Sequence, residues 1–145
     1  MITPLTPLYW KRRAVKYYPE KVAVIDGAKR FTYRQFDERT NQLSNALLSA
    51  GFSKGDHIAV IMTNTHQMLE AYYGIGQMGA VIVPINYRLN SDDIAYILNH
   101  SDSKALIIDA EYFHLVEEIQ DRIPEIRLII VANPGDGFET SLTYT

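Results

Sequence analysis

Polar side chains follow the apolar runs of this sequence at the points where strands are expected to end. In chain order they are Thr63-Asn64, Asn86-Tyr87-Arg88, Asp109 and Asn133. Open α/β sheets bind ligands outside the carboxyl ends of their strands, so we expect any chemistry of the chain there. Arg88 is the one cation of this set and can meet an anionic ligand, although a surface arginine more often pairs with a neighbour or stays hydrated. These residues include few groups that could act in catalysis, which indicates a scaffold without a catalytic centre.

Motifs for nucleophilic, triphosphate or metal chemistry are not found in the sequence. It contains no G-x-S-x-G elbow and no G-x-x-x-x-G-K-[ST] loop. The absence of cysteine excludes disulfides, thiolate metal sites and cysteine nucleophiles. The acidic pair Asp92-Asp93 can in principle bind a cation, but its place just after Ser91 favours first-turn acids below a helix N-cap. Four histidines lack metal-ligand spacing and are interpreted as surface or helix-end residues: His57, His66, His100 and His114.

Gly74-x-Gly76-x-x-Gly79 matches the spacing of a dinucleotide-binding loop. That loop holds phosphate only where a strand precedes it and a helix follows. Here helical spacing comes before the glycines and an apolar strand comes after them. We therefore predict that Gly74 and Gly76 permit close helix packing and that Gly79 ends the helix in a left-handed conformation.

A phosphoacceptor domain of the receiver type fits the length and the alternation of strands and helices. Such a domain needs acidic residues after its first strand, beside the acceptor aspartate, to hold magnesium. Asp109 follows a predicted strand suitably, but the first parallel strand ends in Met62-Thr63-Asn64 without an acid. The receiver interpretation fails at the metal site.

Composition narrows the class of protein. The 145 residues are 47% hydrophobic and 21% charged, with a net charge of −3, which is typical of one globular domain and argues against a nucleic-acid partner. The basic cluster Lys11, Arg12, Arg13 and Lys16 can be a membrane-surface face, an anion-binding face or part of a presequence, but the solvated side of a first helix is favoured. No apolar run approaches the roughly 20 residues of a membrane span, so a cytoplasmic protein is expected by default.

Local signals place a helix and a hairpin first. Thr6 and Pro7 begin a helix that runs to about Tyr18. Val22 to Asp26 and Lys29 to Phe31 flank an Asp-Gly turn and form a short hairpin. Thr32-Tyr33-Arg34-Gln35 is a capping box, and the helix that it begins ends at Gly51.

A regular alternation of strands and helices then follows. Strands are predicted at 57–62, 80–85, 105–108 and 128–131, and helices at 65–78, 92–99 and 111–122. Three strands have continuous apolar runs (Val81-Ile82-Val83, Ala105-Leu106-Ile107-Ile108 and Leu128-Ile129-Ile130-Val131), which indicates burial on both faces. The sequence therefore predicts an α/β fold: a parallel sheet of at least four strands with helices on both faces, preceded by a helix and a short β-hairpin.

An ordered set of short motifs resembles the amino-terminal part of the AMP-forming acyl-CoA synthetase and adenylation-domain superfamily. The set runs from about Tyr17 to Val131, and no single piece of it is specific. The wording of Val83-Pro84-Ile85-Asn86-Tyr87-Arg88-Leu89 is most similar to ligases acting on fatty or aromatic acids. The other pieces are Phe31-Thr32-Tyr33-x-x-Phe36, Leu43-x-x-Ala46-Leu47, Gly55-Asp56-His57-Ile58-Ala59-Val60, Ile94-x-x-Ile97-Leu98-x-x-Ser101 and Ala105-Leu106-Ile107-Ile108-Asp109.

The resemblance implies a ligase that first makes an acyl-adenylate from a carboxylic acid and ATP, assisted by magnesium, and then an acyl-CoA thioester. In the family, the motifs for this chemistry lie further along the chain. Residues 1–132 are therefore expected to be an amino-terminal subdomain (1–21 first helix, 22–32 hairpin, 33–132 sheet region), and 133–145 a linker. This chain is expected to be inactive alone and to bind ATP, Mg2+ or coenzyme A without high affinity. A carrier-loading adenylation domain and a non-catalytic interaction module are the alternatives.

The resemblance also implies a site and a surface. Asn86, Tyr87 and Arg88 are candidates for a rim that contacts coenzyme A, with Arg88 as the phosphate partner. The hairpin at 22–31 is expected to join a different sheet that later residues complete. We therefore expect exposed apolar surface and self-association in this chain.

Overall fold

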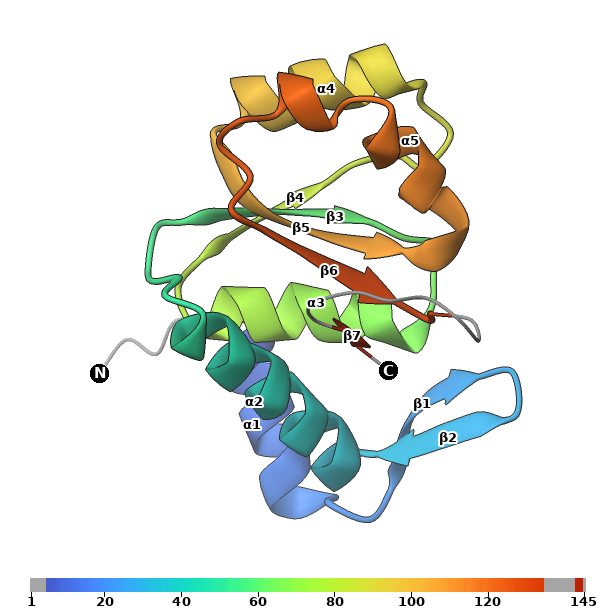
Figure 1. The fold of residues 1–145 in the computed structure, drawn as a ribbon. Coiled ribbons are helices and arrows are strands. Elements are labelled where there is room, and N and C mark those ends of the chain that lie inside the picture. The colour runs from blue at the N-terminus through green and yellow to red at the C-terminus, as the bar shows by residue number, and fades with distance from the viewer. Residues whose placement is uncertain (1–4, 135–142, 145) are drawn as a thin grey trace.

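A parallel sheet forms the centre of the molecule, with helices above and below it (Figure 1). The computed structural model describes residues 5–134 and the backbone of residues 143–144. The sheet has the strand order β4-β3-β5-β6-β7, and each neighbouring pair is parallel. The elements are α1 Pro7–Tyr17, β1 Val22–Asp26, β2 Lys29–Thr32, α2 Tyr33–Ser49, β3 His57–Ile61, α3 His66–Gln77, β4 Val81–Pro84, α4 Ser91–His100, β5 Ser103–Asp109, η1 Ala110–Tyr112, α5 Phe113–Glu117, η2 Gln120–Arg122, β6 Leu128–Ala132 and β7 Thr143–Tyr144.

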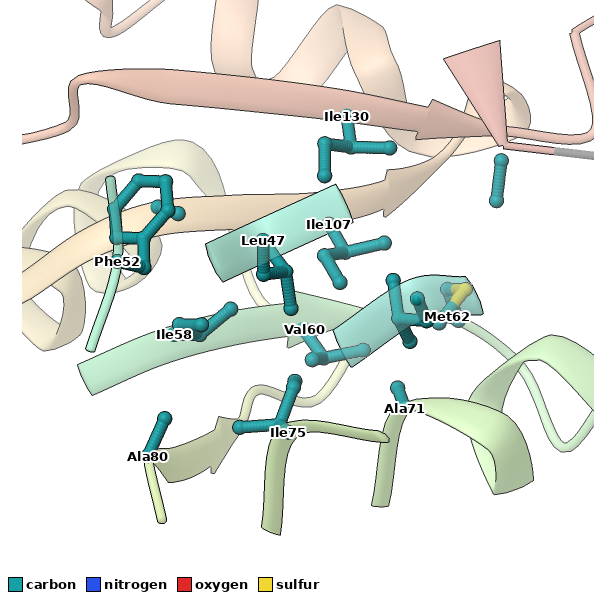
Figure 2. Close-up of a cluster of buried hydrophobic side chains, with 13 residues drawn as sticks. Leu47, Phe52, Ile58, Val60, Met62, Ala71, Ile75, Ala80, Ile107 and Ile130 are labelled. Carbon is teal, nitrogen blue, oxygen red and sulfur yellow. The ribbon is translucent and has the colours of Figure 1, made fainter. Parts of the chain in front are cut away.

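Alternate residues of the central strands face two separate apolar cores. On one face Ile58 and Val60 of β3 pack with Leu47 of α2 and Ile75 of α3 (Figure 2). The other face of the same strand packs against α4 and α5. Because a strand turns successive side chains to opposite faces, an uninterrupted apolar run fills both cores at once. The predicted α/β fold with helices on both faces is confirmed.

The second parallel strand is less buried than its sequence predicts. Val81 is 43% exposed, and the other residues of β4 are half-buried or exposed. In the described chain β4 pairs with β3 and is the edge of the sheet. The prediction that Val81-Ile82-Val83 is buried on both faces is therefore wrong, because an apolar run reports hydrophobicity and not position in the sheet.

The helix predicted over 111–122 is broken into three short turns, η1, α5 and η2. The break contains bonds of the tighter i to i+3 kind: the Ile119 amide donates to the Val116 carbonyl at 3.0 Å. Val116, Ile119 and Ile123 are all buried in the second core. Spacings of three and four residues suit both an α-helix and successive 3-10 turns, so the pattern does not distinguish them.

Local helix signals are otherwise accurate. The Thr6 hydroxyl caps α1, and Thr32 and Gln35 form the predicted capping box of α2. The N-cap of α4 is Asn90, whose Oδ1 accepts from the Asp93 amide at 2.9 Å. The cap predicted at Ser91 is thus one residue too late, because Ser91 is already helical.

The three glycines of the G-x-G-x-x-G pattern have different roles. A Cβ at Gly74 would lie 2.9 Å from Leu43 Cδ2, so this glycine permits the close approach of α2 and α3. Gly79 has φ of +82° and follows α3, as predicted. A Cβ at Gly76 would meet no atom within 4 Å, so the close-packing prediction is wrong for Gly76.

The hairpin β1–β2 forms a sheet of its own, apart from the parallel sheet (Figure 1). Its attachment to the helices combines polar bonds with aromatic stacking. Asp26 Oδ2 accepts from the His66 backbone amide at 3.0 Å and lies 2.6 Å from His66 Nδ1, which ties the hairpin to the start of α3. Phe31 of β2 stacks on the His66 ring with centroids 4.9 Å apart.

Candidate functional site at the carboxyl edge of the sheet

The carboxyl ends of β3 and β5 meet at a topological switch point. β3 leads into α3 on one face of the sheet, whereas β5 leads towards α5 on the other (Figure 1). In open α/β sheets, ligands bind outside such a point, where the connections diverge. The residues that leave the strands here are those on which the sequence interpretation concentrated.

A chain of side-chain hydrogen bonds crosses this edge from β5 through Asn133 to α3. Asp109 is buried; its Oδ1 accepts from the Glu111 amide at 3.1 Å and its Oδ2 from Asn133 Nδ2 at 2.8 Å. Asn133 Oδ1 in turn accepts from Gln67 Nε2 at 2.5 Å. Asn133 has φ of +52°, a left-handed conformation that asparagine tolerates better than most residues. The network fixes the ends of two strands to the first turn of α3.

The network leaves one buried acceptor without a donor among the described residues. Gln67 is 1% exposed, and its Oε1 has no hydrogen-bond partner there. Turning the Gln67 amide over does not relieve this, because a carboxylate only accepts and Asp109 therefore fixes the orientation of Asn133. Asn133 therefore presents its Oδ1 to Gln67, and this oxygen must be met by the NH2 group of Gln67. The Gln67 Oε1 is then left to face away from Asn133 without a donor within residues 5–134. A buried acceptor left unpaired costs about 1–3 kcal/mol, so a donor at this position would be stabilising.

The loop after β4 is a tight turn that presents an aromatic and a cation. Asn86 Oδ1 accepts from the Arg88 amide at 3.0 Å, and the Leu89 amide donates to the Asn86 carbonyl at 3.2 Å. Tyr87 stacks on Tyr112 with ring centroids 4.9 Å apart. The Arg88 guanidinium lies 5.5 Å from the Tyr87 ring centroid. Within residues 5–134, Arg88 makes no ion pair with a carboxylate.

Tyr112 is the member of this aromatic pair that the sequence interpretation missed. It lies three residues past Asp109, in the 3-10 turn that follows β5. Burial raises the pKa of Tyr112 above its ordinary range, and the Glu111 carboxylate adds to that shift. The phenol therefore stays protonated at neutral pH and remains a hydrogen-bond donor. Its signal in the sequence was its place just after a strand end.

The predicted site residues thus fall into two groups. Tyr87 and Arg88 lie together on the turn after β4, whereas Asp109 and Asn133 belong to the network with Gln67. No hydrogen bond or ion pair joins the two groups in the part of the chain that the structure describes. The arrangement offers a cation beside a stacked aromatic pair and a rigid polar edge.

A second polar cluster holds the hairpin beside the start of α3. The hydrogen bond from His66 lowers the pKa of Asp26 below its ordinary value of 3.8. His66 is 3% exposed, so its interpretation as a helix-end residue is right but a surface position is not. Arg39 lies over Phe31 and forms two hydrogen bonds with the buried Glu70. These contacts position the hairpin against the start of α3.

Within the described residues, no group of three or more histidine, aspartate or glutamate side chains is placed to hold a metal ion. Over the same residues, no helix combines the length and apolarity that crossing a membrane requires.

Apolar surface is exposed along α3 and the hairpin. Ile25, Leu69 and Tyr72 are 64%, 38% and 45% exposed. Leu69 and Tyr72 also line an open hollow of about 470 Å³ together with Pro7 and Leu8 of α1. The expected exposed apolar surface is present.

Comparison with known proteins gives a consistent set of relatives. The family described as AMP-binding enzyme matches residues 11–143. The 4-hydroxybutyrate–CoA ligase 2 of Metallosphaera sedula is 38% identical over 132 residues, which cover 91% of this chain and 24% of that protein. The peroxisomal acetate/butyrate–CoA ligase AAE7 of Arabidopsis thaliana is 37% identical over 116 residues, which cover 80% of this chain and 20% of that protein. The chain therefore spans a quarter or less of the length of these relatives.

Solved structures of ligases share this fold. The anthranilate CoA ligase AuaEII in complex with anthranoyl-AMP superposes with a TM-score of 0.86 and 26% identity, covering 95% of this chain and 27% of that one. A putative long-chain-fatty-acid CoA ligase from Rhodopseudomonas palustris gives a TM-score of 0.86 and 26% identity, covering 96% of this chain and 35% of that one.

Proposed function

Because the chain belongs to the AMP-binding enzyme family, we propose that it is the amino-terminal part of an ATP-dependent, AMP-forming carboxylate–CoA ligase. The observation that carries the proposal is the match over residues 11–143 to a family whose similar members are named as CoA ligases. The structural likeness to a ligase holding anthranoyl-AMP supports the acyl-adenylate as the intermediate.

The proposed reaction has two steps. A carboxylate oxygen of the acid attacks the α-phosphorus of ATP and releases pyrophosphate, and the thiol of coenzyme A then displaces AMP to form the thioester. We propose a fatty acid as the first candidate substrate and an aromatic acid as the second. The similar proteins named for butyrate, benzoate and long-chain acids all act on carboxylic acids with an apolar group.

The described residues are proposed to act as scaffold and not as the adenylating centre. Stabilising the charge that develops on a triphosphate requires cations, backbone amides or metal ligands placed around it. Asp109, the carboxylate at the end of β5, is already bonded to Asn133 and Glu111, and within residues 5–134 no cluster of carboxylates is placed to hold Mg2+. We therefore assign no magnesium ligand to residues 5–134.

Asn86, Tyr87 and Arg88 are proposed to form part of the rim that contacts coenzyme A. The turn fixes the backbone of Arg88, and its guanidinium lies beside the stacked Tyr87 without a carboxylate partner among the described residues. A guanidinium binds phosphate through two parallel hydrogen bonds, which suits the phosphates of the coenzyme. Tyr87 and Tyr112 offer an aromatic surface at the same place.

ATP–pyrophosphate exchange with a panel of carboxylic acids tests the proposed reaction. The complete gene product is assayed beside the 145-residue chain. We expect acid-dependent exchange in the complete protein and none in the chain. Exchange catalysed by the 145-residue chain alone contradicts the proposal that this part of the protein is only a scaffold. A complete protein that is inactive with every acid contradicts the ligase proposal.

The coenzyme A rim is tested with Arg88→Ala in the complete protein. We expect the KM for coenzyme A to rise by about 10- to 150-fold, because one charge-assisted phosphate contact is typically worth about 1.5–3 kcal/mol. The exchange rate, which does not involve coenzyme A, should stay unchanged. Arg34→Ala is the matched control, since Arg34 is exposed and pairs with Glu20 at the start of α2, away from the turn after β4. If the KM for coenzyme A is the same in both variants, Arg88 does not contact coenzyme A.

Two further expectations concern assembly and location. We propose that the 145-residue chain self-associates through the apolar surface around Leu69 and Tyr72, which sedimentation velocity tests by a mass above 16.5 kDa. A cytoplasmic location is also proposed, although similar Arabidopsis ligases are named as peroxisomal. Fractionation of the source cells decides between these locations.

A further inference from the structure

One face of α1 and the loop after it carry exposed aromatic rings interleaved with cations. We name this the basic aromatic surface and define it by Trp10, Arg13, Lys16, Tyr17, Tyr18 and Lys21. Trp10, Arg13 and Tyr17 are spaced by three and four residues and therefore share one face of the helix. Trp10 is 53% exposed, and Tyr17 and Tyr18 are each 60% exposed.

Each ring is more than half exposed and lies within 6 Å of a neighbouring cation, and Trp10 also contacts Tyr9 edge-on. Arg13 lies 5.9 Å from the Trp10 ring centroid, Lys16 5.5 Å from that of Tyr17, and Lys21 5.9 Å from that of Tyr18. A shallow recess of about 440 Å³ lies beside two of these pairs, lined by Trp10, Arg13, Ala14, Tyr18, Lys21 and Tyr33. The buried anchor of the same helix, Lys11, points the other way, into α2 and α3.

The positive charge of this surface is not neutralised within the described chain. Arg13, Lys16 and Lys21 form no ion pair with a carboxylate in residues 5–134. The nearby Glu20 is already paired with Arg34 at 2.6 Å. The whole chain has a net charge of −3, so this positive charge is confined to the patch. The exposed aromatic rings distinguish the patch from an ordinary hydrated helix face.

We propose that the basic aromatic surface docks the protein on an anionic lipid bilayer. Tyrosine and tryptophan side chains are amphipathic and partition to the headgroup region, where one end of the ring is apolar and the other is wet. Lysine and arginine beside them are attracted to anionic headgroups. The patch combines both groups on one side of a helix at the end of the molecule remote from α4 and α5 (Figure 1).

The same composition can in principle bind a single-stranded nucleic acid, but the geometry favours the bilayer. Bases bind by stacking on free ring faces. Here a cation of the chain itself lies over each of the three rings.

Vesicle co-sedimentation of the whole 145-residue chain and of the complete gene product tests the proposal. Phosphatidylcholine vesicles are compared with vesicles that also contain anionic phosphatidylglycerol. We expect binding to the anionic vesicles alone and release as salt is raised. Binding is measured directly, so its failure leaves the proposed ligase activity untouched.

A charge-removing triple variant, Arg13→Gln with Lys16→Gln and Lys21→Gln, locates the binding surface. Each basic residue near an anionic surface strengthens membrane binding roughly fivefold, so removing three of them should weaken the partitioning of the protein onto the vesicles by about a hundredfold. The control Lys54→Gln with Lys104→Gln and Arg122→Gln changes net charge equally at positions before β3, in β5 and in η2. The control should bind within about threefold of the unmodified protein. Equal losses in both variants, with far-UV circular dichroism unchanged, overturn the proposal.

Trp10 provides a second readout in the 145-residue chain, because it is the single tryptophan of the sequence. Its fluorescence should shift to shorter wavelength on anionic vesicles and be quenched by brominated lipid. Vesicle binding without a change in Trp10 emission contradicts docking through this face. A single-stranded oligonucleotide that binds as tightly as the vesicles, and is lost in the same triple variant, identifies a general polyanion site and also overturns the proposal.

Discussion

Replacing Lys11 by methionine tests the buried anchor that holds α1 to the rest of the molecule. The Lys11 Nζ lies 2.7 Å from each of three acceptors, Asp37 Oδ1, Thr40 Oγ1 and Gln77 Oε1. An ammonium has three protons to donate, so these acceptors satisfy it. The Lys11 side chain is 4% exposed, and its partners come from both α2 and α3. One side chain therefore joins three helices.

The structure sets the expected loss. Removing one partner of a buried ion pair typically costs about 3–5 kcal/mol, since the remaining charge stays buried and unpaired. The Asp37 side chain is 29% exposed, so water can rehydrate part of it, and we expect the low end, about 3 kcal/mol. Methionine keeps the apolar stem of lysine, so the loss reports the ammonium and not the packing.

Urea unfolding followed by far-UV circular dichroism measures this loss. For a chain of this size, 3 kcal/mol corresponds to a decrease in Tm of roughly 6–12 °C. Lys16→Met is the control, because Lys16 is exposed on the same helix and contacts the Tyr17 ring. That control should change the free energy of unfolding by less than about 0.5 kcal/mol. If Lys11→Met loses no more than Lys16→Met, the ammonium is hydrated in the folded protein and the anchor does not exist.

Three more substitutions test the packing and the pH dependence. Gly74→Ala should destabilise the fold by about 1–3 kcal/mol, because its Cβ would lie 2.9 Å from Leu43 Cδ2, whereas Gly76→Ala in the same helix should stabilise by about 0.5–1 kcal/mol. Urea midpoints measure both, and equal values contradict the close helix contact. Asp26 has its pKa lowered by His66, so its contribution is present above its ordinary pKa of 3.8 and is lost as pH falls through the lower folded value. The free energy of unfolding should therefore decrease less in the Asp26→Asn variant than in the unmodified chain as the pH is lowered from neutral to strongly acidic. Plots of the free energy of unfolding against pH that run parallel for the two proteins would refute this.

Signals of short range were accurate in the sequence. The caps at Thr6 and Thr32 and the positive φ of Gly79 depend on residues within a few positions, and the structure contains all three. The alternation of strands and helices is also a local pattern, and it predicted the parallel sheet. The motif set identified the family before any contact was visible, because order along the chain needs no structure.

The site was predicted in part. Asp109 and Asn133 were selected because each follows a strand, and the structure joins them by a hydrogen bond. Gln67 was missed, because no local rule connects the first turn of a helix to a residue 66 positions later. Tyr112 was missed for a related reason: its stacking partner Tyr87 lies on another strand exit. The coenzyme A role of Arg88 stays a prediction.

The sequence alone determined the elements, their order and the family of the chain, since these follow from propensity, periodicity and short motifs. The tertiary structure decided which apolar strand is an edge, which glycine meets a neighbour and which polar groups are buried together. Val81 and Ile107 have equally apolar neighbours in the sequence, yet Val81 is 43% exposed and Ile107 is fully buried. The difference arises because burial depends on what packs against a residue from elsewhere in the chain, and a local pattern carries no information about that partner.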